Sequence, residues 1–163
     1  MQALQILDIK QGASHLFTQS SFDYFLVKEA SVTTFSTITI DGHLYTDYFS
    51  DDELETLKDT QYSSWQMIRP IFYSLIKGKK LPRDFSLIFS LSKDNIQNFL
   101  KQYQLEQFED ALEGLYLNFK YKDQKLQVIS GVSLNVFTMD KTVERAWDDM
   151  TKKILKHHKI AFE

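Results

Sequence analysis

The chain alternates along its whole length between segments with the periodicity of strands and segments with the periodicity of helices. Apolar residues recur at every second position in segments such as 115–121, which is typical of strands with one buried face. They recur three and four positions apart in the run Ile96, Phe99 and Leu100, which is typical of a helix that buries one stripe. This mixture predicts an α+β domain and excludes all-helical and all-strand folds.

The first half predicts strands at 3–9, 22–27, 32–40 and 43–49, and a helix over 12–19. Ser50 with Glu53, and Ser63 with Gln66, have the spacing of capping boxes, in which two side chains satisfy backbone donors at a helix start. These pairs predict the starts of a short acidic helix and of a longer apolar helix that ends before Gly78.

Two features modify this pattern. Asp41-Gly42 is a dipeptide that favours a type I′ turn, because both central residues of that turn need positive φ, and it predicts a tight hairpin between 32–40 and 43–49. Pro70 lies inside the longer helix, where it removes a backbone donor and disfavours helical angles at Arg69. We therefore expect a kink or a late restart of the helix there.

The second half repeats the same order of elements. Strands are predicted at 84–91, 115–121, 126–130 and 134–138, with a turn at 122–124 and a bulge at Gly131. Ser92 is expected to cap a helix, 105–112 to form a shorter one, and Asp140 to cap the last one. The predicted order of elements in each half is therefore strand, helix, three strands, helix, with the halves at 1–81 and 82–163. This order predicts duplicated βαβββα units, built as antiparallel meanders with amphipathic helices packed on one face, within a single domain over 1–163.

The charge and hydrophobicity of the chain limit the classes of partner that we expect it to bind. The 163 residues carry 19 basic and 22 acidic groups, a net charge of −3, so we expect no nucleic-acid partner, since such binding depends on neutralising phosphates. The apolar runs are far shorter than the ~18 residues of a membrane span, so no membrane partner is expected. There is no cysteine and no leader pattern at the start, and the chain is expected to be cytoplasmic.

Motifs that would indicate catalysis are missing from the sequence. It has no glycine-rich phosphate loop and no serine elbow, so neither a nucleotide cofactor nor a serine hydrolase is predicted. His157 and His158 are adjacent on a predicted helix and point about 100° apart, which suits the helix C-terminus better than a shared metal. His15 is expected to be solvated only. We expect no catalytic residues, no metal and no cofactor.

The segment from Lys77 to Arg83 is the best candidate for ligand binding. Lys77, Lys79, Lys80 and Arg83 place four cations in seven residues at a helix end, where a phosphate or an acidic partner would bind. Arg69, in an aromatic segment, is added to this anion site. The alternative is that the lysines only complement the helix dipole and the arginine fulfils a structural role.

A second candidate surface consists of His43, Tyr45, Tyr48 and Phe49 on the predicted hairpin. If this strand lies at an edge of the sheet, its aromatic side chains form an interface between copies of the chain. A catalytic alternative also starts here, because His43 with Asp41 or Asp47 nearby has the residue types of a general base.

Three stretches carry a resemblance to a known family. They are 40–44, the run from Trp65 through 69–70 to 76–82, and 114–118 together with 137–141 and 147–148. The whole chain resembles a family of bacterial proteins, mostly from Gram-positive anaerobes, that is catalogued as a domain of unknown function. The resemblance implies a bacterial cytosolic protein and supplies no activity, cofactor or site. The order of elements is also similar to that of sliding-clamp domains, although the first predicted helix has a neutral outer face.

The sequence as a whole predicts a noncatalytic cytosolic protein that binds an anionic ligand or an acidic partner, as a homo-oligomer if the aromatic surface is an interface. Two alternatives stay open. One is a small enzyme that acts on an anionic metabolite through His43 with nearby carboxylates, or through Arg69. The other is a clamp-like module associated with nucleic acid.

Overall fold

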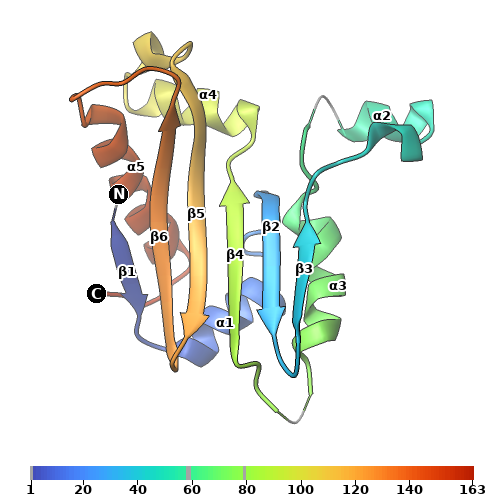
Figure 1. Cartoon of the computed structure of the whole chain (residues 1–163). Coiled ribbons are helices and arrows are strands. Elements are labelled where there is room, and N and C mark those ends of the chain that lie inside the picture. Colours follow the sequence, from blue (N-terminus) through green and yellow to red (C-terminus); the bar gives the residue numbers. More distant parts are fainter. Residues whose placement is uncertain (1, 58–59, 79) are drawn as a thin grey trace.

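Six strands form one antiparallel sheet in the order β1-β6-β5-β4-β2-β3 (Figure 1). The structure is a computed structural model, and it describes residues 2–57, 60–78 and 80–163. The strands are β1 (Ala3–Ile6), β2 (Leu26–Thr33), β3 (Thr37–Asp41), β4 (Asp84–Ser90), β5 (Leu112–Lys122) and β6 (Lys125–Leu134). The helices are α1 (Ile9–Phe17), α2 (Asp51–Leu57), α3 (Trp65–Ile76), α4 (Lys93–Gln102) and α5 (Thr142–His157), with 3-10 turns η1 (Thr46–Tyr48) and η2 (Glu106–Phe108).

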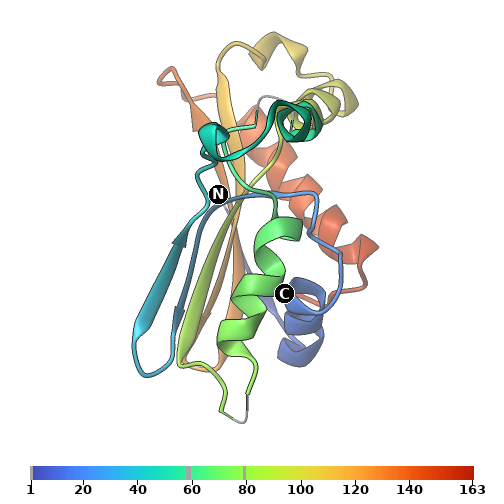
Figure 2. The same ribbon diagram turned by 90° about the vertical axis from the view of Figure 1, so that its right-hand side faces the viewer.

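Helices α1, α3 and α5 cover one face of the sheet, and the described helices leave the other face open (Figure 2). Helices α2 and α4 lie beyond one end of the strands (Figure 1). The predicted α+β class is confirmed. In β4, Phe85, Leu87 and Phe89 are buried and the alternate residues up to Ile88 are partly exposed, as expected for a strand with one covered face.

The predicted duplication is not shown by the strand order. Strands β4, β5 and β6 are consecutive neighbours and form a meander. In the first half, β2 and β3 pair with each other, but β1 lies at the far edge of the sheet beside β6. The two halves therefore do not form equivalent units, because the N-terminal strand completes the sheet of the second half.

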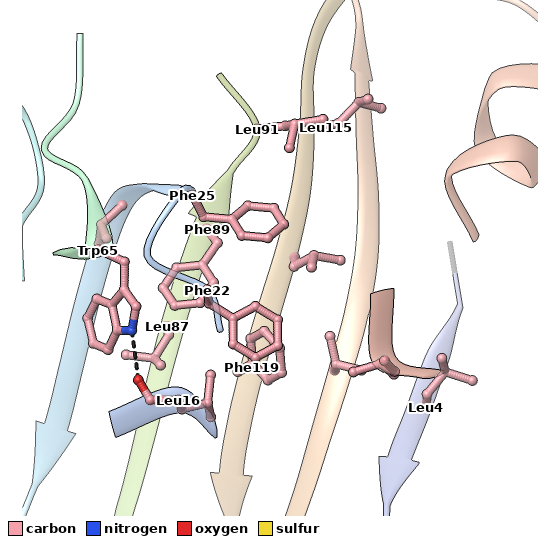
Figure 3. Packing of buried hydrophobic residues seen from close by; sticks show 14 of the residues in the cluster. Leu4, Leu16, Phe22, Phe25, Trp65, Leu87, Phe89, Leu91, Leu115 and Phe119 are labelled. Atoms are coloured by element: carbon pink, nitrogen blue, oxygen red, sulfur yellow. Dashed lines mark hydrogen bonds between the residues drawn. The ribbon is translucent and has the colours of Figure 1, made fainter. Parts of the chain in front are cut away.

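The core between the sheet and its helices is rich in aromatic side chains. Phe22, Phe25, Phe89 and Phe119 are fully buried, with ring centroids 5.2–6.1 Å apart (Figure 3). The pairs are tilted, edge-to-face or, for Phe25 with Phe89, stacked, and such packing stabilises aromatic pairs beyond the area that they bury. Phe22 and Phe25 lie in a turn before β2, so the strand predicted at 22–27 begins only at Leu26.

Each of the two tryptophans is fully buried and fixes a helix through a hydrogen bond. The indole N–H of Trp65 in α3 donates to the carbonyl oxygen of Leu16 in α1 at 2.7 Å (Figure 3). The indole N–H of Trp147 in α5 donates to the carbonyl oxygen of Tyr116 in β5 at 2.9 Å. Because a buried indole N–H without an acceptor is costly, these bonds set how α3 and α5 sit.

The predicted hairpin at Asp41-Gly42 is wrong. The β2–β3 hairpin turns at 34–36, and 43–49 contains no strand, only η1 and an isolated bridge between His43 and Tyr62. Gly42 meets a different need, since a Cβ there would lie 1.7 Å from the carbonyl oxygen of Val27. Glycine is required at position 42 by the close approach of two chain segments, not by positive φ. The true turn at 34–36 was not predicted, because the β-branched residues of 32–40 have the composition of one continuous strand.

Other boundaries also differ from prediction. Segment 105–112 forms only η2, and 134–138 leaves the sheet after Leu134. Gly131 pairs regularly with Tyr116, so no bulge occurs there, and the register shifts lie at Val27/Glu29 and Leu112/Gly114. The turn at 122–124 is confirmed, with positive φ at Asp123 and Gln124, the backbone that a two-residue hairpin requires.

The predicted helix starts are largely confirmed. Ser50 and Glu53 form a reciprocal capping box, and Ser92 accepts from the backbone N–H of Asn95. At α3 the cap is Ser64 rather than Ser63.

Two further predictions about helices have mixed outcomes. Helix α3 runs as one element through Pro70, so a late restart does not occur, whereas the alternative expectation of a kink stays a prediction. At α5 the capping position is Lys141, although the carboxylate of Asp140 accepts from the backbone N–H of Thr142.

The substitution Gly42→Ala tests the close approach beside β2. The added methyl group would overlap the carbonyl of Val27, and we expect the free energy of unfolding in urea to fall by about 1–3 kcal/mol. Gly131→Ala is the matched control, because its methyl group would lie 3.8 Å from Cβ of Tyr116, an ordinary contact. Equal stability of the two variants would contradict this role of Gly42.

Candidate functional site

The register of the strands brings several loops together at one end of the sheet, here called the basal end. Thr33 pairs with Asp84 there, and Tyr121 pairs with Leu126, which in turn pairs with Ile6. The β2–β3 turn, the β5–β6 turn and the segment between α3 and β4 therefore share this end (Figure 1). That segment, 77–83, is the basic loop predicted from the sequence.

A groove of about 490 Å³ opens at the basal end between α1 and the C-terminal half of α3. Its volume is in the range of pockets that hold small organic ligands. The lining consists of Ile9, Lys10, Ala13, Ser14, Phe17, Thr18, Tyr73, Ile76, Lys77, Gly78, Leu81, Pro82, Phe85, Tyr121 and Leu126.

Three aromatic rings in mutual contact form part of the wall of the groove. The ring of Phe17 meets that of Phe85 edge-on at 5.2 Å between centroids, and Phe85 stacks on Tyr121 at 5.3 Å. Phe17 and Phe85 are buried, whereas Tyr121 is partly exposed. These residues come from α1, β4 and β5, so the wall is continuous with the core and is held by the sheet.

The charged residues of the groove have one sign. Lys10 in α1 and Lys77 at the end of α3 line it, and both side chains are exposed. Among the described lining residues there is no aspartate or glutamate. An apolar groove with two ammonium groups and no carboxylate is suited to a ligand with an apolar body and an acidic head.

The residues of the predicted anion site are only partly brought together. Lys77 lies in the groove, and Lys80 and Arg83 are exposed on the loop beside it. The backbone N–H of Arg83 donates to the carbonyl oxygen of Thr33 at 2.8 Å, which ties the loop to the β2–β3 turn. Lys79 lies outside the described residues.

Arg69 has a different environment from the basic loop. Its guanidinium donates to both carboxylate oxygens of Asp23, at 2.8 and 2.9 Å, and to the carbonyl oxygen of Phe17 at 3.3 Å. The hydrogen bond with Asp23 raises the pKa of Arg69. The ion pair joins α3 to the turn after α1. Because Asp23 balances the charge of Arg69, no bound anion is needed to explain why this arginine is partly buried.

The predicted aromatic surface lies near the opposite end of the sheet, here called the apical end. Tyr45 and Tyr48 are exposed, and the ring of His43 packs edge-on against Tyr45 and Tyr62. Phe49 is only partly exposed, with its ring edge-on to Tyr48. The carboxylate of Asp41 accepts from the backbone N–H of His43, so this contact does not involve the imidazole.

A wider depression of about 810 Å³ also lies at the apical end, between α2, the start of α4 and the sheet. Its charged lining residues are of mixed sign, namely Lys93, Asp94 and Glu113. The ammonium group of Lys28 lies over the rings of Tyr62 and Tyr116, both of which line the depression, at 5.8 and 4.8 Å. A mixed lining of this kind selects no single ligand chemistry.

Three histidines from distant parts of the sequence meet where α5 ends. The ring of His158 lies 5.7 Å from that of His15 and 5.0 Å from that of His157. Burial, followed by the neighbouring charges of His157 and His15, lowers the pKa of His158. The adjacency of His15 was missed because α1 and α5 are far apart in the sequence. Within the described residues no such group has the geometry to hold a metal ion.

Comparison with known families gives one match. A model described as a family of unknown function, DUF5721, matches residues 15–163. The chain belongs to this family. The resemblance to a family of unknown function is therefore confirmed, and the match covers all the groove residues except Ile9, Lys10, Ala13 and Ser14 of α1. No curated protein and no solved structure matches the chain. In the part of the chain that the structure describes, no helix has the length and apolar character of a membrane span.

The bond between Arg69 and Asp23 is tested by Arg69→Lys. A lysine cannot reproduce the two parallel hydrogen bonds, and we expect the free energy of unfolding to fall by about 1–2 kcal/mol in urea titrations. Lys153→Met is the control, because it removes an exposed ion pair with Asp149 and little change is expected. If Arg69→Lys is as stable as the wild type, the proposed structural role of Arg69 is wrong.

The lowered pKa of His158 predicts a pH dependence of stability. The unfolded chain binds a proton near the ordinary pKa of 6.5 and the folded chain only at lower pH, so stability is full above 6.5 and is lost as the pH falls below it. The variant His158→Gln is expected to lose part of this dependence in thermal unfolding between about pH 7.5 and pH 5.5. His43→Gln, which lies outside the cluster, should keep it. Identical pH profiles for all three proteins would refute the assignment.

Proposed function

We propose that this protein is a noncatalytic binding protein for an anionic amphiphile, held in the groove between α1 and α3. The observation that carries the proposal is the combination of an apolar wall with two lysines and no described carboxylate. Burial of an alkyl chain contributes about 0.8 kcal/mol per methylene group, and an acidic head at the rim pairs with the ammonium groups.

The position of Lys10 supports a role beyond solubility. It lies in the first turn of α1, where the helix dipole disfavours a cation, and the one carboxylate at this helix end is that of the N-cap Asp8, which accepts the backbone N–H of Gln11. Lys77 is the C-cap residue of α3, and the helix dipole stabilises a cation at a C-terminus. An anion between the two lysines would compensate the unfavourable position of Lys10.

The chemistry of the lining favours binding over catalysis. The groove presents hydroxyl groups from Ser14, Thr18, Tyr73 and Tyr121, and its described lining has no histidine or carboxylate that would act as a general base. The alternative of an enzyme that uses His43 or Arg69 receives no support from their neighbours, which are tyrosine rings and Asp23 respectively. The proposal is therefore a binding function.

The proposal is tested by titrating the protein with dodecanoate below its micellar concentration, with calorimetric detection. We expect one binding event, weakened about fivefold by Lys10→Gln and by Lys77→Gln, because each removes one charge pair at the rim. Ala13→Trp should abolish binding by placing a ring in the groove, with an unchanged circular dichroism spectrum as the check on folding.

Two controls separate charge from hydrophobicity. Lys101→Gln removes an exposed lysine from α4, far from the groove, and should leave the affinity unchanged. Dodecyltrimethylammonium, with the same chain and the opposite charge, should bind weakly. The proposal fails if dodecanoate does not bind, or if Ala13→Trp binds it as the wild type does.

A further inference from the structure

We infer that the basal end docks onto an anionic lipid bilayer, from which the groove receives its amphiphile. This inference rests on the proposed function and names the source of the ligand. It starts from two apolar side chains that no other part of the structure covers. Phe35, at the tip of the β2–β3 turn, is 98% exposed, and Leu81, on the basic loop, is 85% exposed.

The two apolar tips belong to one surface. The backbone bond from Arg83 to Thr33 holds the basic loop against the β2–β3 turn, so the exposed side chains of Phe35 and Leu81 belong to neighbouring segments. Leu81 is exposed at the surface and also lines the same groove as the rings of Phe17, Phe85 and Tyr121.

The charges around the tips complement an anionic surface. Exposed cations at this end are Lys10, Lys77, Lys80, Arg83, Lys122 and Lys125. The described acidic residues of the same loops and turns are Asp8, Asp84 and Asp123. Asp8 keeps its negative charge while it caps α1, and Asp84 pairs with Arg83 at 3.9 Å, but the six described cations still outnumber these three carboxylates. Cations that surround exposed apolar side chains are the pattern of interfacial membrane binding, in which the apolar tips insert and the cations remain at the headgroups.

The opposite end of the molecule has the opposite charge. Helix α2 contains four carboxylates, at Asp51, Asp52, Glu53 and Glu55, and no basic residue. It lies beyond the apical end of the sheet (Figure 1). An anionic surface therefore attracts one end of the molecule and repels the other, which orients the groove toward the lipid.

An exposed phenylalanine alone does not indicate a membrane contact, and the chain supplies its own comparison. Phe137 is 94% exposed in the segment that follows β6 at the apical end. The start of β5 pairs with the end of β6, the strand that precedes Phe137. The acidic residues around this start of β5 are Glu109, Asp110 and Glu113. Of these two exposed phenylalanines, Phe35 lies among a surplus of described cations and Phe137 does not.

The test measures co-sedimentation with vesicles of phosphatidylcholine and of phosphatidylcholine with about one third phosphatidylglycerol. We expect the wild type to bind the anionic vesicles, with binding lost as the salt rises from about 0.05 M to about 0.5 M. Phe35→Ser should weaken vesicle binding about tenfold and leave the affinity for monomeric dodecanoate unchanged, since Phe35 does not line the groove.

The matched control is Phe137→Ser, which removes an equally exposed ring from the apical end and should bind vesicles as the wild type does. Equal vesicle binding by the two variants overturns the inference, and so does equal binding of the wild type to the neutral vesicles. If dodecanoate binds and vesicles do not, this inference fails and the proposed function stands. If dodecanoate does not bind, the proposed function fails and takes this inference with it.

Discussion

The last turn of α1 presents backbone carbonyls that have no partner within the helix, and α3 satisfies two of them. Trp65 donates to the carbonyl of Leu16 and Arg69 to that of Phe17. The first bond is fully buried, and the second is reinforced by the carboxylate of Asp23. With this end of α1 fixed against α3, residues of both helices line the groove at the basal end. The same contacts that close the core thus define the candidate site.

Much of the architecture follows from local patterns. The strand at 84–90 and the helices capped by Ser50 and Ser92 were predictable, because side-chain period and capping depend only on nearby residues. The failures concern long-range contacts. Gly42 suggested a turn, but glycine is needed there because the backbone of β2 lies too close for a side chain at position 42. Strand β1 pairs with β6, a partner that local sequence does not specify.

The candidate site was predictable only in part for the same reason. The basic loop is a local cluster of charge, and Lys77 does lie in the groove. The wall was not predictable, because Phe17, Phe85 and Tyr121 have the ordinary periodicity of core residues. A signal for Lys10 was present, a cation in the first turn of a helix, but it required the helix to begin at Ile9 rather than at Gly12. Arg69 was grouped with the loop by composition, whereas its partner is Asp23.

The two edges of the sheet differ. Strand β1 is bordered by the last residues of the chain, since Gln5 and Glu163 exchange backbone hydrogen bonds and Ile6 bridges to Phe162. Along the described chain, β3 has no neighbour on its outer side, and its side chains are mostly exposed. Among the described strands, β3 is thus the edge that is directly open to strand addition. Two copies joined symmetrically through β3 would each use this edge, so pairing through β3 alone ends at a dimer and does not propagate into a fibre.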